Sequence, residues 1–217
     1  MRKINLSVIS NDVTGNTLAN LTESDSAKLT DFLRSATAST RDAIPAPGTF
    51  PLVIYVQGYG SSLQDNSTLC ESLASKGSVV LGSAYQDESG HMIAGRDASA
   101  NDIRFLVQCA RNMPKVEFSR IALVGHGGGA QTSLLYASQE GSIVDAVVSL
   151  DTTQDDYFSD KALFRNYLDR IRPENLEVPI LAAPNQGAIY EFLDSCRNAV
   201  RTYLTVDKLG HEGFTSE

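Results

Sequence analysis

The chain has 217 residues, of which 42% are hydrophobic and 20% are charged, and its formal net charge is −8. This length suits one globular domain with a core large enough to need no disulfide or metal support. The acidic balance, without a basic run, argues against a nucleic-acid binder, and no stretch approaches the roughly 20 apolar residues of a membrane span. The N-terminal MRKINLSVIS lacks an apolar segment of signal-peptide length, so the sequence predicts a soluble chain and indicates nothing further about its location.

Two parts of the chain differ in their residue pattern. Residues 1–49 are rich in Thr, Ser, Asn and Asp, and they predict an edge strand at 4–9, a helix at 24–35 and an irregular stretch at 42–48. Residues 50–217 alternate between apolar runs and helical patterns. We expect this second part to form the core of a single domain, with residues 1–49 as an N-terminal extension of it.

The core pattern predicts a doubly wound α/β fold. Continuous apolar runs are typical of strands buried on both faces of a parallel sheet, and they occur at 51–56, 78–85, 121–125, 145–151, 179–184 and 201–208. Helical patterns lie between them, at 68–75, 99–112, 128–139, 162–171 and 190–200. For the second of these helices, Ser99 and Asp102 form a predicted capping box. Strand and helix alternating in this way indicate a mostly parallel sheet with helices on both faces.

The glycine-rich stretch IALVGHGGGAQTS, residues 121–133, joins the third predicted strand to a helix. One interpretation is a dinucleotide site, because Gly125, Gly127 and Ala130 fit G-x-G-x-x-[G/A] and Asp151 ends the next strand, where an acid would bind a ribose. The pattern has few fixed positions, however. A dinucleotide fold also normally begins with this unit, whereas two buried strands precede it here.

The second interpretation is the nucleophile elbow of an α/β-hydrolase, G-x-S-x-G. Gly125 and Gly129 would be its outer glycines, which let the strand and the helix approach closely. The nucleophile position is then residue 127, and that residue is glycine.

Two further segments fit a hydrolase site. The first strand runs into QGYGSS, residues 57–62, where such folds carry a loop that contributes a backbone N–H to the oxyanion hole. Gln57 stands where that loop often has a histidine. The last strand runs into LGHEGF, residues 209–214, which contains His211. The order of elbow, Asp151 and His211 along the chain is the hydrolase order.

The sequence resembles the bacterial α/β-hydrolases related to platelet-activating-factor acetylhydrolases and dienelactone hydrolases, over residues 41–216. The resemblance rests on RDAIPAPGTFPLVIYVQGYGSS, CESLASKGSVVLGSAY, DIRFLVQCARN, VEFSRIALVGH, AVVSLD and LGHEGFTS. It implies an esterase or lipase frame that acts on acyl esters. In the acetylhydrolase branch the triad acid follows the strand after the elbow, which corresponds to Asp151. The alternative position, after the next strand, holds NQGAIY and offers no carboxylate before Glu191.

The resemblance assigns roles to five positions. His211 would be the general base and acid, and Asp151 would orient its imidazole. The backbone N–H groups of Tyr59 and Gly128 would form the oxyanion hole. Gly127 occupies the nucleophile position, and His126 beside it is expected to pack rather than to react. No metal or cofactor motif occurs, and we expect a small-molecule ester or acyl ligand; the sequence does not indicate an oligomeric state.

Glycine cannot form an acyl-enzyme, so the covalent route is closed. No other G-x-S-x-G occurs in the sequence. The elbow pattern does not surround any of the other candidate serines, Ser61, Ser62 and Ser133. Glycine does relieve the strained conformation of the elbow, which costs a side-chain-bearing residue about 1–3 kcal/mol. Three interpretations remain open: a family member that lost its serine naturally and binds without turnover or acts weakly, an esterase whose serine was removed on purpose, and a dinucleotide-binding domain.

Overall fold

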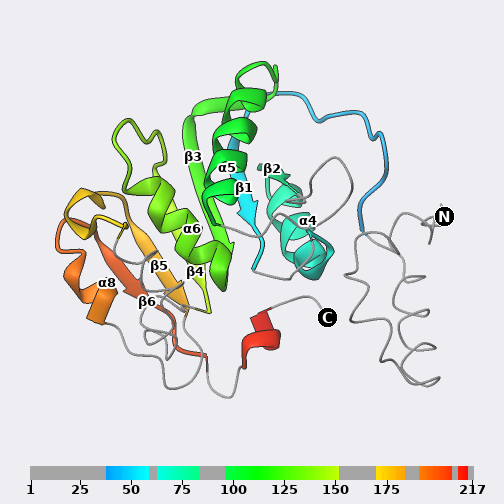
Figure 1. Cartoon of the computed structure of the whole chain (residues 1–217). Coiled ribbons are helices and arrows are strands. Elements are labelled where there is room, and N and C mark those ends of the chain that lie inside the picture. Colours follow the sequence, from blue (N-terminus) through cyan, green and yellow to red (C-terminus); the bar gives the residue numbers. More distant parts are fainter. Residues whose placement is uncertain are drawn as a thin grey trace.

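The computed structural model describes residues 38–58, 63–83, 96–151, 170–183, 191–206 and 210–214. Within them lies a six-stranded, wholly parallel sheet of order β2-β1-β3-β4-β5-β6 (Figure 1). The strands are β1 (Phe50–Val56), β2 (Val79–Gly82), β3 (Val116–His126), β4 (Ala146–Leu150), β5 (Ile180–Ala183) and β6 (Arg201–Tyr203). The predicted parallel, doubly wound sheet is therefore confirmed.

Helices lie between the strands and cover both faces of the sheet. They are α4 (Ser67–Ser75), α5 (Arg96–Arg111), α6 (Gly128–Ala137) and α8 (Glu191–Ser195), with short 3-10 turns η1 (Leu63–Asn66), η3 (Pro173–Asn175) and η4 (His211–Phe214). None of the helices in the described part of the chain is long and apolar enough to span a membrane.

The two faces of β1 show how the layers divide. Leu52, Ile54 and Val56 point into the larger core, which α5, α6 and α8 complete. Val53 and Tyr55 point to the opposite face, where residues of α4 cover them. Because successive side chains of a strand alternate between faces, a continuous apolar run is needed to serve both cores.

Strand β3 is longer than the sequence predicted. The expected strand was 121–125, whereas β3 begins at Val116 and ends at His126. Its pairing with β1 is interrupted: Pro51 pairs with Glu117 and Leu52 with Ile121, so three residues of β3 are skipped. Proline has no N–H to donate to a neighbouring strand, so within sheets it is typically found where the pairing of strands is irregular. The residues before Ile121 are partly polar and partly exposed, so the apolar pattern did not indicate that the strand begins before Ile121.

The C-terminal elements are shorter than predicted. Strand β6 ends at Tyr203 rather than at 208, and its last two residues are exposed, so the prediction that every strand is buried on both faces is wrong here. Helix α8 ends at Ser195, and residues 196–200, with a turn at 197–198, are not helical as predicted.

The capping box predicted for α5 is also wrong. Helix α5 begins at Arg96, so Ser99 is its fourth residue and not its cap. A capping pattern is a local preference, and the helix continues through it toward the N-terminus.

Some predicted elements fall outside the described residues. These are the strand at 4–9, the helix at 24–35 and the part of the helix at 162–171 before residue 170; residues 170 and 171 form a turn. Strand β1 begins at Phe50, the first residue of the predicted core, and the division at residue 49 stays a prediction.

Candidate active site

The carboxyl ends of β1 and β3 meet at the point where the winding of the sheet reverses. From β1 the chain goes to β2 on one side, and β3 then returns to the other side of β1. In open α/β sheets, ligands bind outside the carboxyl ends of strands at such a switch point. The stretch following β1 begins with Gln57, and Gly127 follows β3, so the topology brings the two predicted loops to this edge.

Gly127 has the backbone of a sharp strand-to-helix elbow. Its φ is 52° and its ψ is −119°, a combination that side-chain-bearing residues adopt only under strain. Its N–H donates to the carbonyl of Leu150 (3.0 Å), and its own carbonyl accepts a hydrogen bond from Ala130 N–H (3.0 Å). Strand β3 ends at His126 and helix α6 begins at Gly128, so Gly127 is the single residue between strand and helix.

The outer glycines of the elbow leave no room for a side chain. A Cβ on Gly125 would lie 2.5 Å from both the Cα and the nitrogen of Ala130. A Cβ on Gly129 would lie 2.5 Å from the carbonyl oxygen of Gln57 and closer still to that of Val56. All of these neighbours are backbone atoms, which cannot swing away. Glycine at 125 and 129 is therefore a packing requirement.

This requirement distinguishes the two motif interpretations. The hydrolase pattern G-x-S-x-G specifies glycine at 125 and 129, whereas the dinucleotide pattern leaves position 129 open. Since Gly125 contacts Ala130 and Gly129 contacts the end of β1, the packing explains both outer glycines of the hydrolase pattern. The loop also follows the third strand of the described sheet rather than the first. Both facts argue against a dinucleotide site.

Asp151 lies directly beside the elbow. It follows β4, its side chain is fully buried, and its N–H donates to Ala183 O (2.7 Å). The bond from Gly127 N–H to Leu150 O joins the elbow to the residue that precedes Asp151. Asp151 has a φ of 52°, which Asp tolerates better than most residues because its short polar side chain can bond locally. The structure thus brings Gly127 and Asp151 together.

His211 is the first residue of η4, the turn His211–Phe214. Figure 1 draws η4 on the side of the sheet toward which the strand arrows point, which is the side of the elbow. The His211 side chain and the whole of Tyr59 lie outside the described part, and their roles remain predictions. Gly128, the second predicted oxyanion donor, is the first residue of α6.

Buried polar side chains surround the elbow. Gln57 at the end of β1, His126 at the end of β3 and Gln131 in the first turns of α6 are all buried. The expectation that His126 packs is met by this burial. The burial of Gln57 and Gln131 could not be predicted from the sequence, because a single Gln next to a loop gives no indication of whether it is buried.

Ser133 does not replace the missing nucleophile. Its side chain is buried inside α6, and its hydroxyl donates to the carbonyl of Gly129 one turn earlier (2.8 Å). The neighbouring Thr132 hydroxyl donates to Gly128 O in the same way (3.1 Å). Among the described residues no group of His, Cys, Asp and Glu could hold a metal ion.

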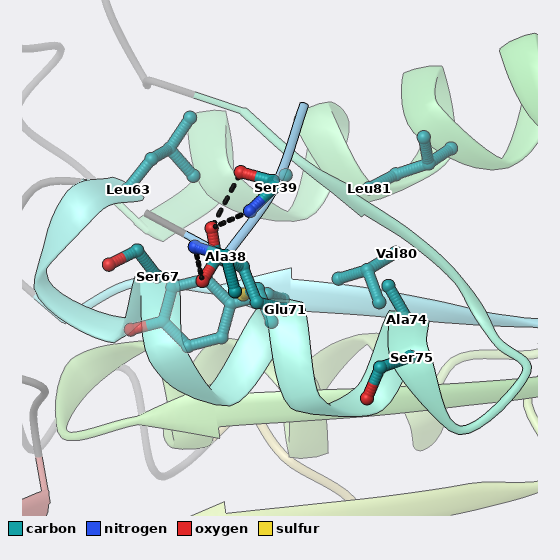
Figure 2. Close-up of a pocket in the computed structure, with 12 residues that line it drawn as sticks. Ala38, Ser39, Leu63, Ser67, Glu71, Ala74, Ser75, Val80 and Leu81 are labelled. Atoms are coloured by element: carbon teal, nitrogen blue, oxygen red, sulfur yellow. Dashed lines mark hydrogen bonds between the residues drawn. The ribbon is translucent and has the colours of Figure 1, made fainter. Parts of the chain in front are cut away.

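A cavity of about 610 Å³ lies beside α4, and its lining does not include Gly127, Gly128 or Asp151. Its apolar lining includes Leu63, Ala74, Val80 and Leu81 (Figure 2). At its mouth the Glu71 carboxylate accepts the backbone N–H groups of Ala38 (3.1 Å) and Ser39 (3.0 Å), and the Ser39 hydroxyl (2.5 Å). These bonds, above all that from the Ser39 hydroxyl, lower the pKa of Glu71. Glu71 thereby fastens the stretch before β1 to α4.

Solved structures with the same architecture identify the fold. The structure of Est1E from Butyrivibrio proteoclasticus with ferulic acid bound is 16% identical, with a TM-score of 0.55 over 73% of this chain and 81% of that chain. A dienelactone hydrolase from Anabaena variabilis is 16% identical, with a TM-score of 0.55 over 82% and 87% of the two chains. A putative dienelactone hydrolase from Klebsiella pneumoniae is 18% identical, with a TM-score of 0.55 over 77% and 78%. The chain has the α/β-hydrolase fold.

The sequence gives a more specific likeness. Residues 27–109 match the family described as platelet-activating factor acetylhydrolase, isoform II. This match and the dienelactone hydrolase structures confirm the resemblance predicted from the sequence. The matched residues run from before β1 into α5 and stop short of the elbow. A search of the curated proteins found no match.

Proposed function

We propose that this chain carries a carboxylic-ester hydrolase site of the Ser-Asp-His type in which Gly127 occupies the nucleophile position, so that its activity is impaired or absent. The observation that carries the proposal is the backbone of Gly127. It keeps the strained elbow conformation, with Gly125 and Gly129 packed against backbone on either side and Asp151 next to it. The frame is that of a nucleophile elbow, and the part that is missing is a CH₂OH group.

The comparisons favour a small ester or acyl ligand. Relatives in fold include dienelactone hydrolases and an esterase-like protein solved with ferulic acid, which is a small aromatic acid. The family matched over residues 27–109 is named for the removal of an acetyl group. We infer that the site at the carboxyl edge of the sheet acts on or binds a neutral or weakly charged acyl ester.

Without a serine, hydrolysis would have to use water directly. Water would attack the acyl carbon, His211 would take its proton, and the same proton would then pass to the departing alkoxide, giving an acid and an alcohol. Asp151 would hold the imidazole, and the N–H groups of Tyr59 and Gly128 would bind the oxyanion. Enzymes that lack a triad member keep about 10³–10⁴-fold acceleration over water from such groups, so a weak activity is the upper expectation.

A non-catalytic binding role is the second candidate. The fully buried Asp151 and the close-packed elbow form a rigid frame that does not require turnover to hold an acyl ligand. If this role is correct, esters should bind and be released unchanged, even when Gly127→Ser supplies a hydroxyl at the elbow. The dinucleotide interpretation is disfavoured by the packing at Gly129.

The test is hydrolysis of p-nitrophenyl acetate and butyrate by this chain, with Gly127, and by its Gly127→Ser variant. We expect serine to raise kcat/KM by at least three orders of magnitude, because it restores the covalent route. Gly127→Ala is the matched control, since it carries the same backbone strain without a hydroxyl. It should leave the rate unchanged.

His211→Ala and Asp151→Ala in the Gly127→Ser background complete the design. Each should remove most of the gain, because serine needs a base and the base needs its orienting carboxylate. A folded Gly127→Ser chain with no gain would overturn the esterase assignment. Binding of the p-nitrophenyl esters by such a chain would then favour the non-catalytic role.

A further inference from the structure

The cavity beside α4 has the size of a small-molecule site. Its volume of about 610 Å³ lies within the range of roughly 300–1,000 Å³ that is typical of ligand pockets. The residues that line it all belong to the described part of the chain, and they come from β1, η1, α4, β2 and the stretch at Ala38 and Ser39. Because none of them is a predicted triad or oxyanion residue, a ligand here would be additional to the one proposed for the elbow.

One wall of the cavity is apolar and belongs to a packed core. Tyr55, Leu63, Cys70 and Val80 line the cavity, and they also pack in the smaller core on the α4 face of the sheet. The Tyr55 hydroxyl is engaged there by Asn66 Nδ2, which donates to it at 2.8 Å. Side chains in a close-packed core shift little, so this wall keeps its shape without a ligand. Such a preformed apolar wall suits the hydrocarbon part of a ligand.

Glu71 is the one charged side chain that lines the cavity. Figure 2 shows its carboxylate reaching from α4 to Ala38 and Ser39. Oε1 accepts two hydrogen bonds, from the N–H and the hydroxyl of Ser39, whereas Oε2 accepts one, from Ala38 N–H (3.1 Å). A carboxylate oxygen has two lone pairs, so Oε2 can accept one further donor. Within the described part of the chain no Lys or Arg forms an ion pair with this carboxylate, and only neutral groups balance its charge.

We propose that this cavity is a second binding site, for a small molecule with an apolar body and a primary ammonium group that donates to Glu71 Oε2. The body would lie against the apolar wall, and the ammonium would lie at the mouth beside the carboxylate. A charge-assisted N–H···O bond is stronger than a neutral one, and the net charge of −8 favours the approach of cations. An anionic ligand would meet the charge of Glu71 with no cation in the lining to offset it.

Titration of the full chain with three six-carbon probes tests the class of ligand. n-Hexylammonium, 1-hexanol and hexanoate share one apolar body and differ in charge. From the amide chemical shifts of α4 and β2 we expect hexylammonium to bind about threefold to tenfold more tightly than hexanol, a modest preference because Glu71 is partly exposed. Hexanoate should bind more weakly than hexanol, and high salt should reduce the preference for hexylammonium. Equal Kd values for hexylammonium and hexanol, or no binding of either, would overturn the proposal.

Charge variants test the role of Glu71. Glu71→Gln keeps the size of the side chain and removes its charge, so hexylammonium and hexanol should then bind within twofold of each other. Glu117→Gln is the matched control, since it removes one charge outside the cavity lining and should leave the preference intact. Ser39→Ala removes a hydrogen bond to Glu71 but keeps the carboxylate, and it should also retain the preference. Loss of the preference in Ser39→Ala, or its survival in Glu71→Gln, would overturn the role of the charge.

A bulky substitution tests the location. Ala74 lies on α4, lines the cavity and is exposed, so Ala74→Trp can fill the space without disturbing a buried position. We expect it to weaken the binding of both hexylammonium and hexanol at least fivefold. Thr68→Trp, on an exposed position of α4 outside the lining, is the control and should change neither Kd more than twofold. Unaltered binding of both probes by Ala74→Trp would place them elsewhere and overturn the proposal.

Discussion

The elbow between β3 and α6 and the end of the sheet at β6 and α8 differ in how tightly their backbones pack. At the elbow, glycine is enforced at 125 and 129 by backbone atoms within 2.5 Å of a would-be Cβ. At the other end, β6 has three residues, and Val200 and Leu204, which flank it, are 71% and 50% exposed. The elbow is packed against the backbone of β1 and α6, whereas β6 pairs with β5 alone in the described sheet and has side-chain hydrogen bonds to α8.

This difference separates the parts of the predicted triad. Gly127 and Asp151 are tied to the sheet by hydrogen bonds to Leu150 and Ala183, at the ends of two buried strands. His211 follows the exposed strand β6. The predicted nucleophile position and the predicted acid thus follow hydrogen-bonded strands, whereas the predicted base comes after a three-residue strand whose last two residues are exposed. Loops placed on a rigid scaffold commonly carry catalytic groups in this way.

The largest effect expected from this comparison is that of Gly129→Ala. Its Cβ would meet the carbonyl oxygens of Val56 and Gln57, so β1 and α6 must separate. We expect a loss of about 3 kcal/mol or more in the free energy of unfolding, measured with urea. The same substitution at Gly210, where a Cβ meets nothing within 4 Å, is the control and should change stability by less than about 1 kcal/mol. Equal effects at the two glycines would break the comparison.

A smaller contrast is expected between two leucines. Leu123 is fully buried in β3, and truncation to Ala should cost about 2–5 kcal/mol of unfolding free energy because it leaves a cavity. Leu204, just after β6, is half exposed, and the same truncation should cost no more than about 0.5 kcal/mol. A cost at Leu204 above about 2 kcal/mol would show that the C-terminal end is packed as closely as the elbow.

The smallest effect concerns the titration of Tyr203 in β6. Although Tyr203 is partly exposed, desolvation of its hydroxyl, followed by its hydrogen bond to Asp194, raises the pKa of Tyr203 to about 12. The pKa of Tyr203 is higher in the folded chain than in the unfolded chain, where it is near 10. The neutral tyrosine therefore contributes to the free energy of unfolding in full below pH 10, and this contribution is lost as the pH rises toward 12. Absorbance titration near 295 nm should show a late-ionising tyrosine that disappears in the Tyr203→Phe variant. A Tyr203→Phe chain with an unaltered titration curve would contradict this assignment.

The sequence predicted the centre of the molecule better than its ends. Apolar runs such as PLVIYV identified buried parallel strands, and the glycines at 125 and 129 identified the elbow, because each pattern reflects a packing need that only those residues satisfy. Strand β6 and helix α8 were overextended, since RTYLTVDK carries an apolar pattern whose burial depends on what covers it.

Other features had no sequence signal. The burial of Gln57 and Gln131 follows from the meeting of β1, β3 and α6, which no single segment encodes. The hydrogen bond from Asn66 to Tyr55 joins the N-terminus of α4 to a strand residue eleven positions earlier, and no local pattern indicates it. Local preference is a weak guide wherever a tertiary contact offers the same side chain a better partner.

The positive φ of Gly127 has a consequence for how such a site can change over time. The shape of the elbow is kept by the residues around position 127 and not by the residue itself. A glycine codon of the form GGT or GGC becomes a serine codon by a single base change, so a hydroxyl could be gained or lost there in one mutational step. The neighbouring backbone would need no remodelling, and a lineage with this fold could cross between turnover and simple binding in either direction.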